Sequence, residues 1–100
     1  MRYLKLREVR STLKVDDALV HTLAEEGLIE IKHTLDDELV ISLDHAERLR
    51  VGALLIREME VNLAGVEIIL RMREDLVGMQ RQFYEVLQTL ASEFRKQLDR

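Results

Sequence analysis

The chain has 100 residues, the size of a single domain, and its formal net charge is −4. With 47% apolar and 34% charged residues, no Pro and only four Gly, the composition excludes disorder and favours a helix-rich fold. Because Cys is absent, disulfides, thiolate catalysis and cysteine-bound zinc are also excluded.

Charge is distributed unevenly along the chain. Residues 1–14 carry five basic side chains against Glu8, whereas residues 16–47 carry ten acidic side chains against Lys32 alone, a formal charge of −9. From Val61 onward, six acids and six bases cancel. The first residues lack the apolar run of a signal peptide, and charges interrupt every apolar stretch well short of membrane-spanning length. We therefore expect a cytoplasmic protein without a membrane segment.

Two short helices are predicted at the start of the chain. Leu6, Val9 and Leu13 are spaced three and four apart, which indicates a helix with one apolar face between the first and the last of them. Asp16 is a suitable N-cap for a second helix, and Gly27 suits the left-handed residue that follows the end of that helix. The order helix, turn, helix results.

A β-hairpin is predicted next. Residues 28–33 and 38–43 are rich in aliphatic and β-branched side chains, and they flank the turn-forming residues 34–37. A two-stranded hairpin is marginally stable alone, so we expect it to pack on the helices.

A third helix is predicted from Asp44 to about Glu60. Asp44 lies three residues before Glu47, which is the spacing of a capping box. The apolar stripe of this helix comprises Leu49, Ala53, Ile56 and Met59.

A fourth helix is predicted from Leu63, with Asn62 as its N-cap. Apolar residues are nearly continuous through Leu70, which predicts burial on several sides. Further along, apolar residues alternate steps of three and four over three repeats, the pattern of a heptad seam. After Leu90 the steps become four, so the strict heptad register is lost. Whether this helix is continuous from Leu63 or broken near residues 73–78 stays open.

A lone chain offers nothing to cover this seam, so a homodimer is predicted. We expect a winged-helix-like domain over residues 1–60 and a helical extension over residues 61–100 that forms coiled-coil-like dimer contacts. The predicted dimer interface comprises Ile69, Met72, Leu76, Met79, Phe83, Val86, Leu90 and Phe94.

The predicted order of elements is that of the MerR-type winged-helix group. Residues 19–29 resemble the MerR segment in which a second helix runs into a Gly-Leu-Leu turn. Residues 44–76 are similar to the chaperone-modulator (CbpM) branch of this group, and Val61-Asn62-Leu63-Ala64-Gly65-Val66 is the most specific piece. The resemblance covers roughly residues 3–80. It implies a mainly α fold: a MerR-like winged helix-turn-helix, a small β-hairpin and a long C-terminal dimerisation helix.

The chain departs from MerR regulators where those proteins contact DNA. They usually place Arg-Tyr-Tyr/Trp-Glu late in the second helix, and here those positions hold His21, Thr22, Leu23 and Ala24. DNA affinity depends on neutralising phosphates with Lys and Arg, so a segment of charge −9 should repel a duplex. A MerR-type DNA-binding regulator is the alternative function, because the basic first helix could contact a DNA backbone.

The CbpM resemblance implies a different partner. It implies binding to the J-domain of a DnaJ- or CbpA-type co-chaperone and inhibition of its productive contact with the Hsp70 chaperone. J-domains carry a basic helix beside their signature loop, and the acidic segment has the complementary charge. The candidate partner-binding residues are Glu25, Glu26, Glu30, Asp36, Asp37 and Glu38. For any one of them, the alternative is an ordinary solvated turn or helix end.

No catalytic, cofactor or metal site is predicted. The three histidines are twelve residues apart, match no short ligand motif and are expected near the surface. No phosphate-binding Gly loop, nucleophile motif or carboxylate pair in an apolar setting occurs, so an enzyme is not expected. Met59, Met72 and Met79 fall on helical stripes and are expected in the core. Tyr84 lies beside the seam and receives no role.

Overall fold

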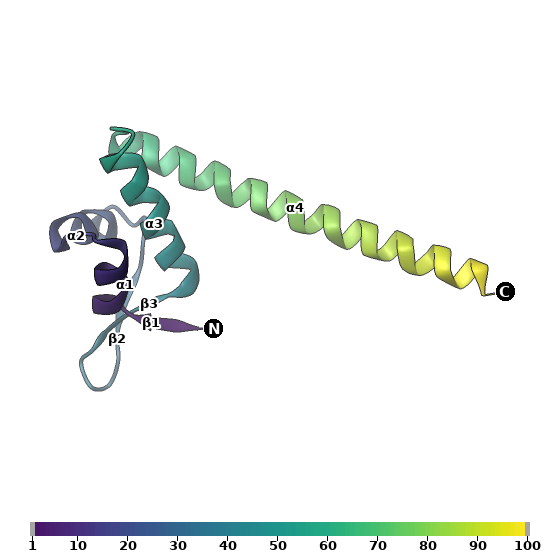
Figure 1. The fold of residues 1–100 in the computed structure, drawn as a ribbon, viewed down its shortest axis with the longest axis horizontal. Coiled ribbons are helices and arrows are strands. Elements are labelled where there is room, and N and C mark those ends of the chain that lie inside the picture. Colours follow the sequence, from purple (N-terminus) through teal and green to yellow (C-terminus); the bar gives the residue numbers. More distant parts are fainter. Residues whose placement is uncertain (1, 100) are drawn as a thin grey trace. The chain divides into compact units, whose positions relative to one another are not determined.

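The computed structural model describes residues 2–99. In chain order, the elements are β1 (Tyr3–Lys5), α1 (Leu6–Leu13), α2 (Asp17–Glu25), β2 (Ile31–His33), β3 (Leu39–Ser42), α3 (Leu43–Arg57) and α4 (Leu63–Leu98) (Figure 1). The chain divides into two compact units, one through Leu70 and one from Arg71 onward. The first unit continues past the predicted boundary at residue 60 because Val66 and Leu70 of α4 are buried in its core.

The helix-turn-helix forms where the sequence predicts it. Leu6 and Val9 of α1 are buried, and Lys14 ends this helix in a left-handed conformation with φ 56°. Asp16 caps α2, because its Oδ1 accepts a hydrogen bond from the backbone N–H of Leu19 at 2.8 Å. The residue after the C-cap of α2, Gly27, has φ 73°, so the predicted left-handed end is confirmed.

The sheet has three strands, and the two-strand prediction is wrong in this respect. The strand order is β1-β3-β2 and both pairs are antiparallel, with Tyr3 opposite Ser42 and Ile31 opposite Ile41. The hairpin of β2 and β3 is as predicted. Strand β1 is three residues long, too short for its own alternation to indicate a strand, and it is held by pairing with β3.

Helix α3 begins and ends earlier than predicted. Its N-cap is Ser42 rather than Asp44: the Ser42 Oγ accepts a hydrogen bond from the backbone N–H of His45 at 3.1 Å. The helix ends at Arg57, and Glu60, in the turn that follows, takes a left-handed φ of 54°. The Val61 N–H donates to the Leu55 carbonyl at 3.0 Å and so holds this turn against the end of the helix.

Helix α4 is unbroken from Leu63 to Leu98, which settles the continuity that the sequence left open. Asn62 caps it as predicted, its Oδ1 accepting from the Gly65 N–H at 2.8 Å. A Cβ at Gly65 would lie 2.7 Å from a Val61 side-chain carbon, so this turn requires Gly.

The expected burial of the first turns of α4 on several sides is wrong. Val66 and Leu70 are buried, but Ile68 and Ile69 are 56% and 36% exposed. The compact unit therefore covers one face of these turns only.

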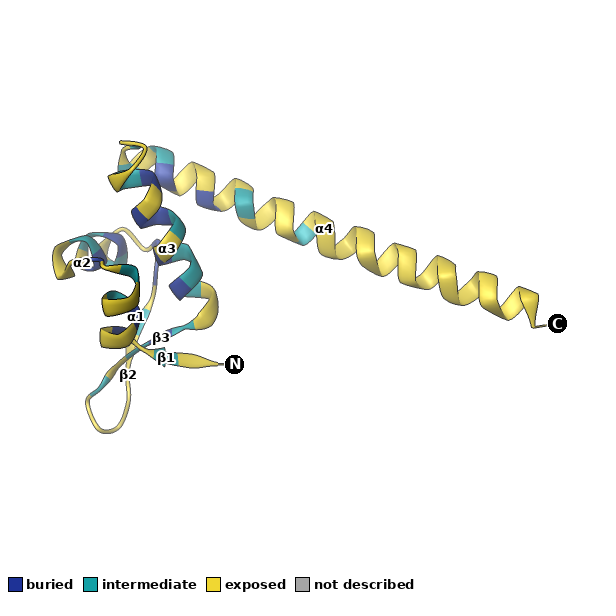
Figure 2. Cartoon of the chain, in the orientation of Figure 1, coloured by how far each residue is buried: buried dark blue, intermediate teal, exposed yellow. Residues whose placement is uncertain are grey.

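The core of the first unit is formed by α1, α2, α3, the sheet and the first turns of α4. Leu23, Ile41, Leu49 and Val66 are completely buried. Gly52 lies where these helices approach closely, since a Cβ there would be 3.5 Å from Leu23 and 3.7 Å from Val66 side-chain atoms. Figure 2 shows the buried residues gathered in the first unit and α4 exposed along most of its length.

Candidate functional site

Helix α2 occupies the position of a recognition helix but carries no basic residue. Val20 and Leu23 face the core, whereas Asp17, His21 and Glu25 are exposed. His21 Nε2 lies 3.0 Å from Glu25 Oε1. The exposed side of this helix therefore presents carboxylates where a DNA-reading helix presents cations.

The hairpin turn between β2 and β3 is held by its own hydrogen bonds. The N–H of Thr34 donates to the Glu38 carbonyl at 2.9 Å, and the Thr34 Oγ1 accepts from the Glu38 N–H at 3.1 Å. Asp37 closes the turn with φ 60°. The turn projects Leu35, which is fully exposed, beside Asp36. An ordered acidic turn with one apolar side chain at its tip results.

The basic side chains near the N-terminus are matched by acids of the same compact unit. Glu38 Oε1 lies 3.9 Å from Lys5 Nζ and 3.5 Å from Arg7, and Arg10 lies 3.7 Å from Asp17. Such exposed pairs contribute less than about 1 kcal/mol each to stability. They nevertheless reduce the positive potential that α1 could offer to a phosphate backbone.

Lys32, the one base in residues 16–47, is also engaged. Its Nζ donates to the Tyr3 hydroxyl at 3.1 Å, lies 5.5 Å from the centroid of that ring and is 3.6 Å from Glu30 Oε1. The hydrogen bond to Tyr3, followed by the electrostatic effects of Tyr3 and Glu30, raises the pKa of Lys32 above its ordinary value. Lys32 therefore stays charged and locally paired at neutral pH.

The structure distributes the six candidate partner-binding acids over two places. Glu25 and Glu26 lie at the C-terminal end of α2, and the other four precede β2 or belong to the hairpin. Five of the six are exposed and Glu38 is half-buried. Within residues 2–99, Glu26 and Asp36 form no ion pair, while Asp37 Oδ1 lies 3.1 Å from His33 Nδ1. Whether these acids contact a partner stays a prediction.

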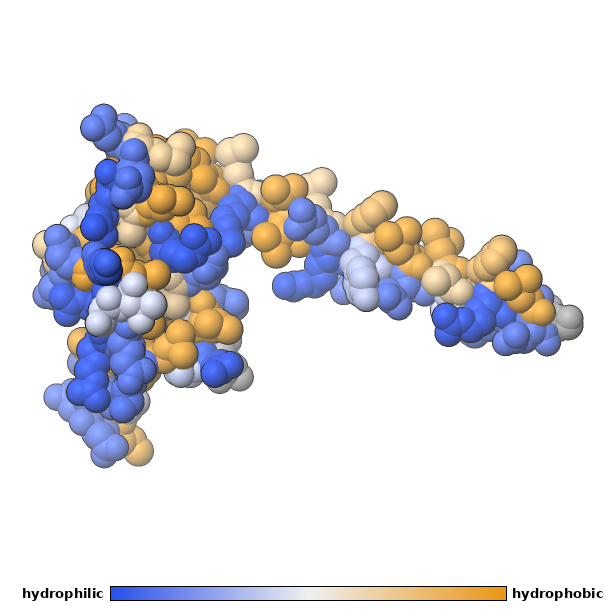
Figure 3. Space-filling view, viewed as in Figure 1, coloured by the Kyte–Doolittle hydropathy of each residue, from blue (hydrophilic) through white to orange (hydrophobic). Residues whose placement is uncertain are grey.

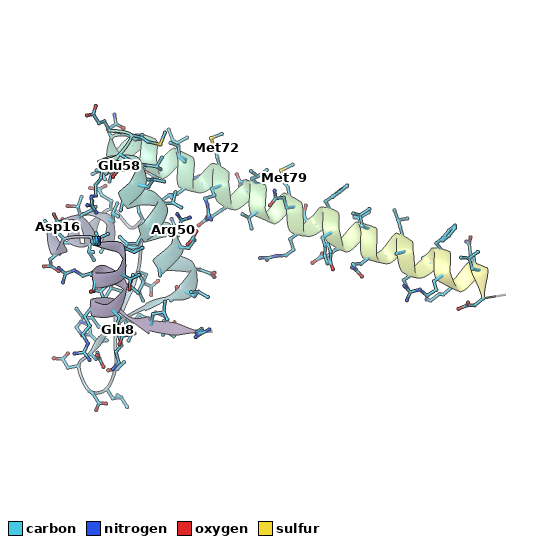
Figure 4. The ribbon with its side chains drawn as sticks, in the orientation of Figure 1. Glu8, Asp16, Arg50, Glu58, Met72 and Met79 are labelled. Atoms are coloured by element: carbon cyan, nitrogen blue, oxygen red, sulfur yellow. The ribbon has the colours of Figure 1, made fainter. Side chains whose placement is uncertain are left out.

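The predicted seam of α4 is exposed throughout. Met72, Met79 and Phe83 are 64%, 65% and 66% exposed, and Met59 in the loop before α4 is 62% exposed. None of the three methionines lies in the core of the single chain, and for Met59 the predicted place in the core is wrong. Met72 and Met79 belong to the predicted dimer seam, and their burial in a dimer stays a prediction. Figure 4 shows Met72 and Met79 on the same side of α4, and Figure 3 shows hydrophobic atoms along that side.

Sequence reasoning missed the apolar surface between α1 and α3. Leu43 and Leu54 of α3 are 51% and 46% exposed. One stripe of α3 carries these two residues together with Ala46, Glu47 and Arg50 at helical spacing, and this pattern is the signal in the sequence that could have indicated the surface. The more regular stripe of Leu49 and Ala53 indicates the core instead.

Metal-binding clusters and membrane-spanning helices are both absent from residues 2–99. No group of three or more His, Asp or Glu side chains there could hold a metal ion. No helix in the same range is both long and apolar enough to cross a membrane.

Comparison with protein families gives one match. The model of the MerR HTH family regulatory proteins matches residues 4–88, which includes the helix-turn-helix, the hairpin, α3 and most of α4. None of the curated proteins compared with this chain matches it. The four helices, the small antiparallel sheet and the long C-terminal helix agree with the winged helix-turn-helix architecture expected of this family. The chain belongs to the MerR HTH family of regulatory proteins.

Proposed function

We propose that this chain regulates a DnaJ- or CbpA-type co-chaperone by binding its J-domain and inhibiting productive contact with the Hsp70 chaperone. The observation that carries this proposal is the charge of the helix-turn-helix and hairpin. Residues 16–47 carry ten acids and one base, and α2 has no Lys or Arg. A basic protein surface is a better partner for such a segment than a phosphate backbone.

The choice of partner rests on sequence resemblance. Residues 44–76 are similar to chaperone modulators of the CbpM type, and J-domains carry a basic helix of complementary charge. Residues 61–66, the most specific piece of that resemblance, form the loop and cap that start α4. Their role in this chain is thus structural, and the acids supply the recognition.

The alternative is a DNA-binding regulator of the MerR type. Membership of a helix-turn-helix family favours it, and so do the five bases of residues 1–14. Three of those bases lie within 4 Å of carboxylates from α2 and the hairpin, which lowers their value for phosphate contacts. We therefore rank protein binding first.

Dimerisation through α4 is part of the proposal. The eight predicted interface residues are all exposed in the single chain, and an apolar stripe of this length costs free energy in water unless another surface covers it. A second copy of α4 offers a stripe of matching length and chemistry.

The proposal is tested by measuring the binding of the full chain to the full-length co-chaperone of the same cell by biolayer interferometry, which gives the association rate. Binding is expected, and the association rate should fall steeply as salt is raised. In the variant Glu26→Lys/Asp36→Lys, the association rate should drop about tenfold because two steering charges are reversed. Glu85→Lys, an exposed charge reversal on α4, is the matched control and should change it little.

Two results would count against the proposal. Absence of binding by the wild-type chain would reject the co-chaperone as partner. Binding with an association rate indifferent to salt and to Glu26→Lys/Asp36→Lys would remove the acidic residues from recognition.

A further inference from the structure

A groove lies between α1 and α3 within the first compact unit. Its volume is about 610 Å³, and its apolar lining comprises Leu4, Val9, Leu13, Leu43 and Ala46. Leu43, at the start of α3, is 51% exposed. The groove is a concave apolar surface that contains none of the predicted partner-binding or dimer-interface residues.

The groove continues along α3. A second hollow of about 320 Å³ shares Leu13 and Arg50 with the first and adds Ala53 and Leu54 to the apolar lining. Together the two hollows follow α3 from Leu43 to Arg57, a distance of about 21 Å at the rise of an α-helix. This length matches about four turns of a partner helix.

The two ends of the groove differ in charge. Glu8 of α1 and Asp44 and Glu47 of α3 line the first hollow. Lys14, Arg57 and Glu58 line the second. Arg50, between them, donates to Glu47 with an Nη2 to Oε1 distance of 2.6 Å, and this hydrogen bond raises the pKa of Arg50. Figure 4 labels Glu8 on α1 and Arg50 on α3. Apart from that pair, the first hollow carries the two acids Glu8 and Asp44, whereas the second carries two cations and one acid, Glu58.

The shape and charges of the groove indicate which kind of partner would fit it. An amphipathic helix would bury its apolar face on Leu43, Ala46 and Leu54, as in helix-in-groove recognition. Lys or Arg at one end of that helix would lie near Glu8 and Asp44. A duplex fits poorly, because it offers no apolar face and would bring phosphates to the same carboxylates.

We propose that this groove receives the apolar face of a basic amphipathic helix from the co-chaperone, an inference that rests on the proposed function. The acids of α2 and the hairpin steer the encounter over about a Debye length, roughly 10 Å at 0.1 M salt. The groove provides the short-range contacts that hold the complex together. Charge reversals on α2 and the hairpin should thus act on association, and polar substitutions in the groove on dissociation.

The experiment measures both rate constants by biolayer interferometry, with the full chain and the full-length co-chaperone. The groove variants are Leu43→Gln and Leu54→Gln; both side chains are about half exposed, so each variant should keep the wild-type thermal unfolding curve. The expected result is a dissociation rate raised about tenfold with an association rate within about twofold of wild type. Leu35→Gln, the same change at the fully exposed hairpin tip, is the matched control and should leave the dissociation rate unchanged.

Each of the other outcomes overturns the inference, and each can be distinguished from the rest. Wild-type binding with a dissociation rate unaffected by both groove variants would reject the groove and leave the proposed function standing. A dissociation rate raised by Leu35→Gln alone would mean that the contact lies at the hairpin and not in the groove. If Leu43→Gln or Leu54→Gln converts the free protein from dimer to monomer in sedimentation, a second copy of the chain occupies the groove. If the wild-type chain does not bind, the proposed function fails and this inference fails with it.

Discussion

Within residues 2–99, four residues have left-handed backbone conformations, and each lies at a reversal of the chain. Lys14 ends α1, Gly27 follows α2, Asp37 closes the hairpin turn and Glu60 follows α3. A left-handed conformation costs a residue with a Cβ roughly 1–2 kcal/mol, and Gly avoids this cost. Only one of the four positions carries Gly, so three reversals are maintained by the packing of the elements they join.

The first prediction compares two of these positions by opposite substitutions. Gly27→Ala should destabilise the protein by about 1 kcal/mol through backbone strain alone, because an added Cβ meets nothing within 4 Å. Glu60→Gly should stabilise it by up to about 1 kcal/mol, since Gly is the preferred residue after a helix end. Urea unfolding of both variants gives the two values, and effects of the same sign would contradict this account.

At the scale of elements, α4 gives the clearest relation between pattern and structure. Its cap at Asn62 and its apolar seam could be read from the sequence, since both depend on residues close in the chain. Its continuity through residues 73–78 could not, because Gly78 is compatible with either outcome. In the structure Gly78 lies inside the helix, and an added Cβ there would meet nothing.

Features that depend on distant residues were predicted less well. Strand β1 depends on its pairing with β3, in which Tyr3 lies opposite Ser42, 39 positions further along the chain. The candidate acids could be named, but not the pairing of Glu38 with Lys5 and Arg7. The α1–α3 groove was invisible for the same reason, because no local pattern records which helix faces meet.

The second prediction concerns the seam of α4. If two copies pack antiparallel along it, Phe83 lies near the middle of the interface. Phe83→Asp would then bury an unpaired carboxylate, which costs several kcal/mol of dimer stability. The dimer should therefore dissociate. Arg81→Asp, an exposed neighbour, should change little, because a charge at the rim of a coil contributes about 1 kcal/mol or less.

Sedimentation of wild type, Phe83→Asp and Arg81→Asp at micromolar concentration checks this prediction. A monomeric wild type would mean that the seam is covered in some other way. A dimeric and folded Phe83→Asp protein would place the contact elsewhere on the chain.

At the scale of the whole molecule, charge and apolar surface are assigned to different parts of the sequence. Residues 16–47 hold most of the acidity, whereas the charges from Val61 onward cancel and that segment carries the exposed seam. In the proposed function, the helix-turn-helix and hairpin select a partner by charge, and the last helix sets the oligomeric state. The family match supports a regulatory role in general.

The third prediction concerns DNA. At physiological salt the chain should form no specific complex with the promoter of its own operon, because α2 lacks cations to neutralise phosphates. His21→Arg/Thr22→Tyr should not restore binding by itself, since the surrounding acids remain. Fluorescence anisotropy with labelled duplex measures this, and sub-micromolar, sequence-dependent binding would promote the DNA-binding alternative.

One measurement tests most directly whether this protein prevents a J-domain co-chaperone from acting on Hsp70, as we propose. ATP hydrolysis by Hsp70 is followed in the presence of the full-length co-chaperone while this chain is added in increasing amounts. The stimulated rate should fall towards the rate of Hsp70 alone, and the unstimulated rate should not change, because the co-chaperone is the component that is bound. A stimulated rate that stays constant at a saturating concentration of the chain would contradict the account.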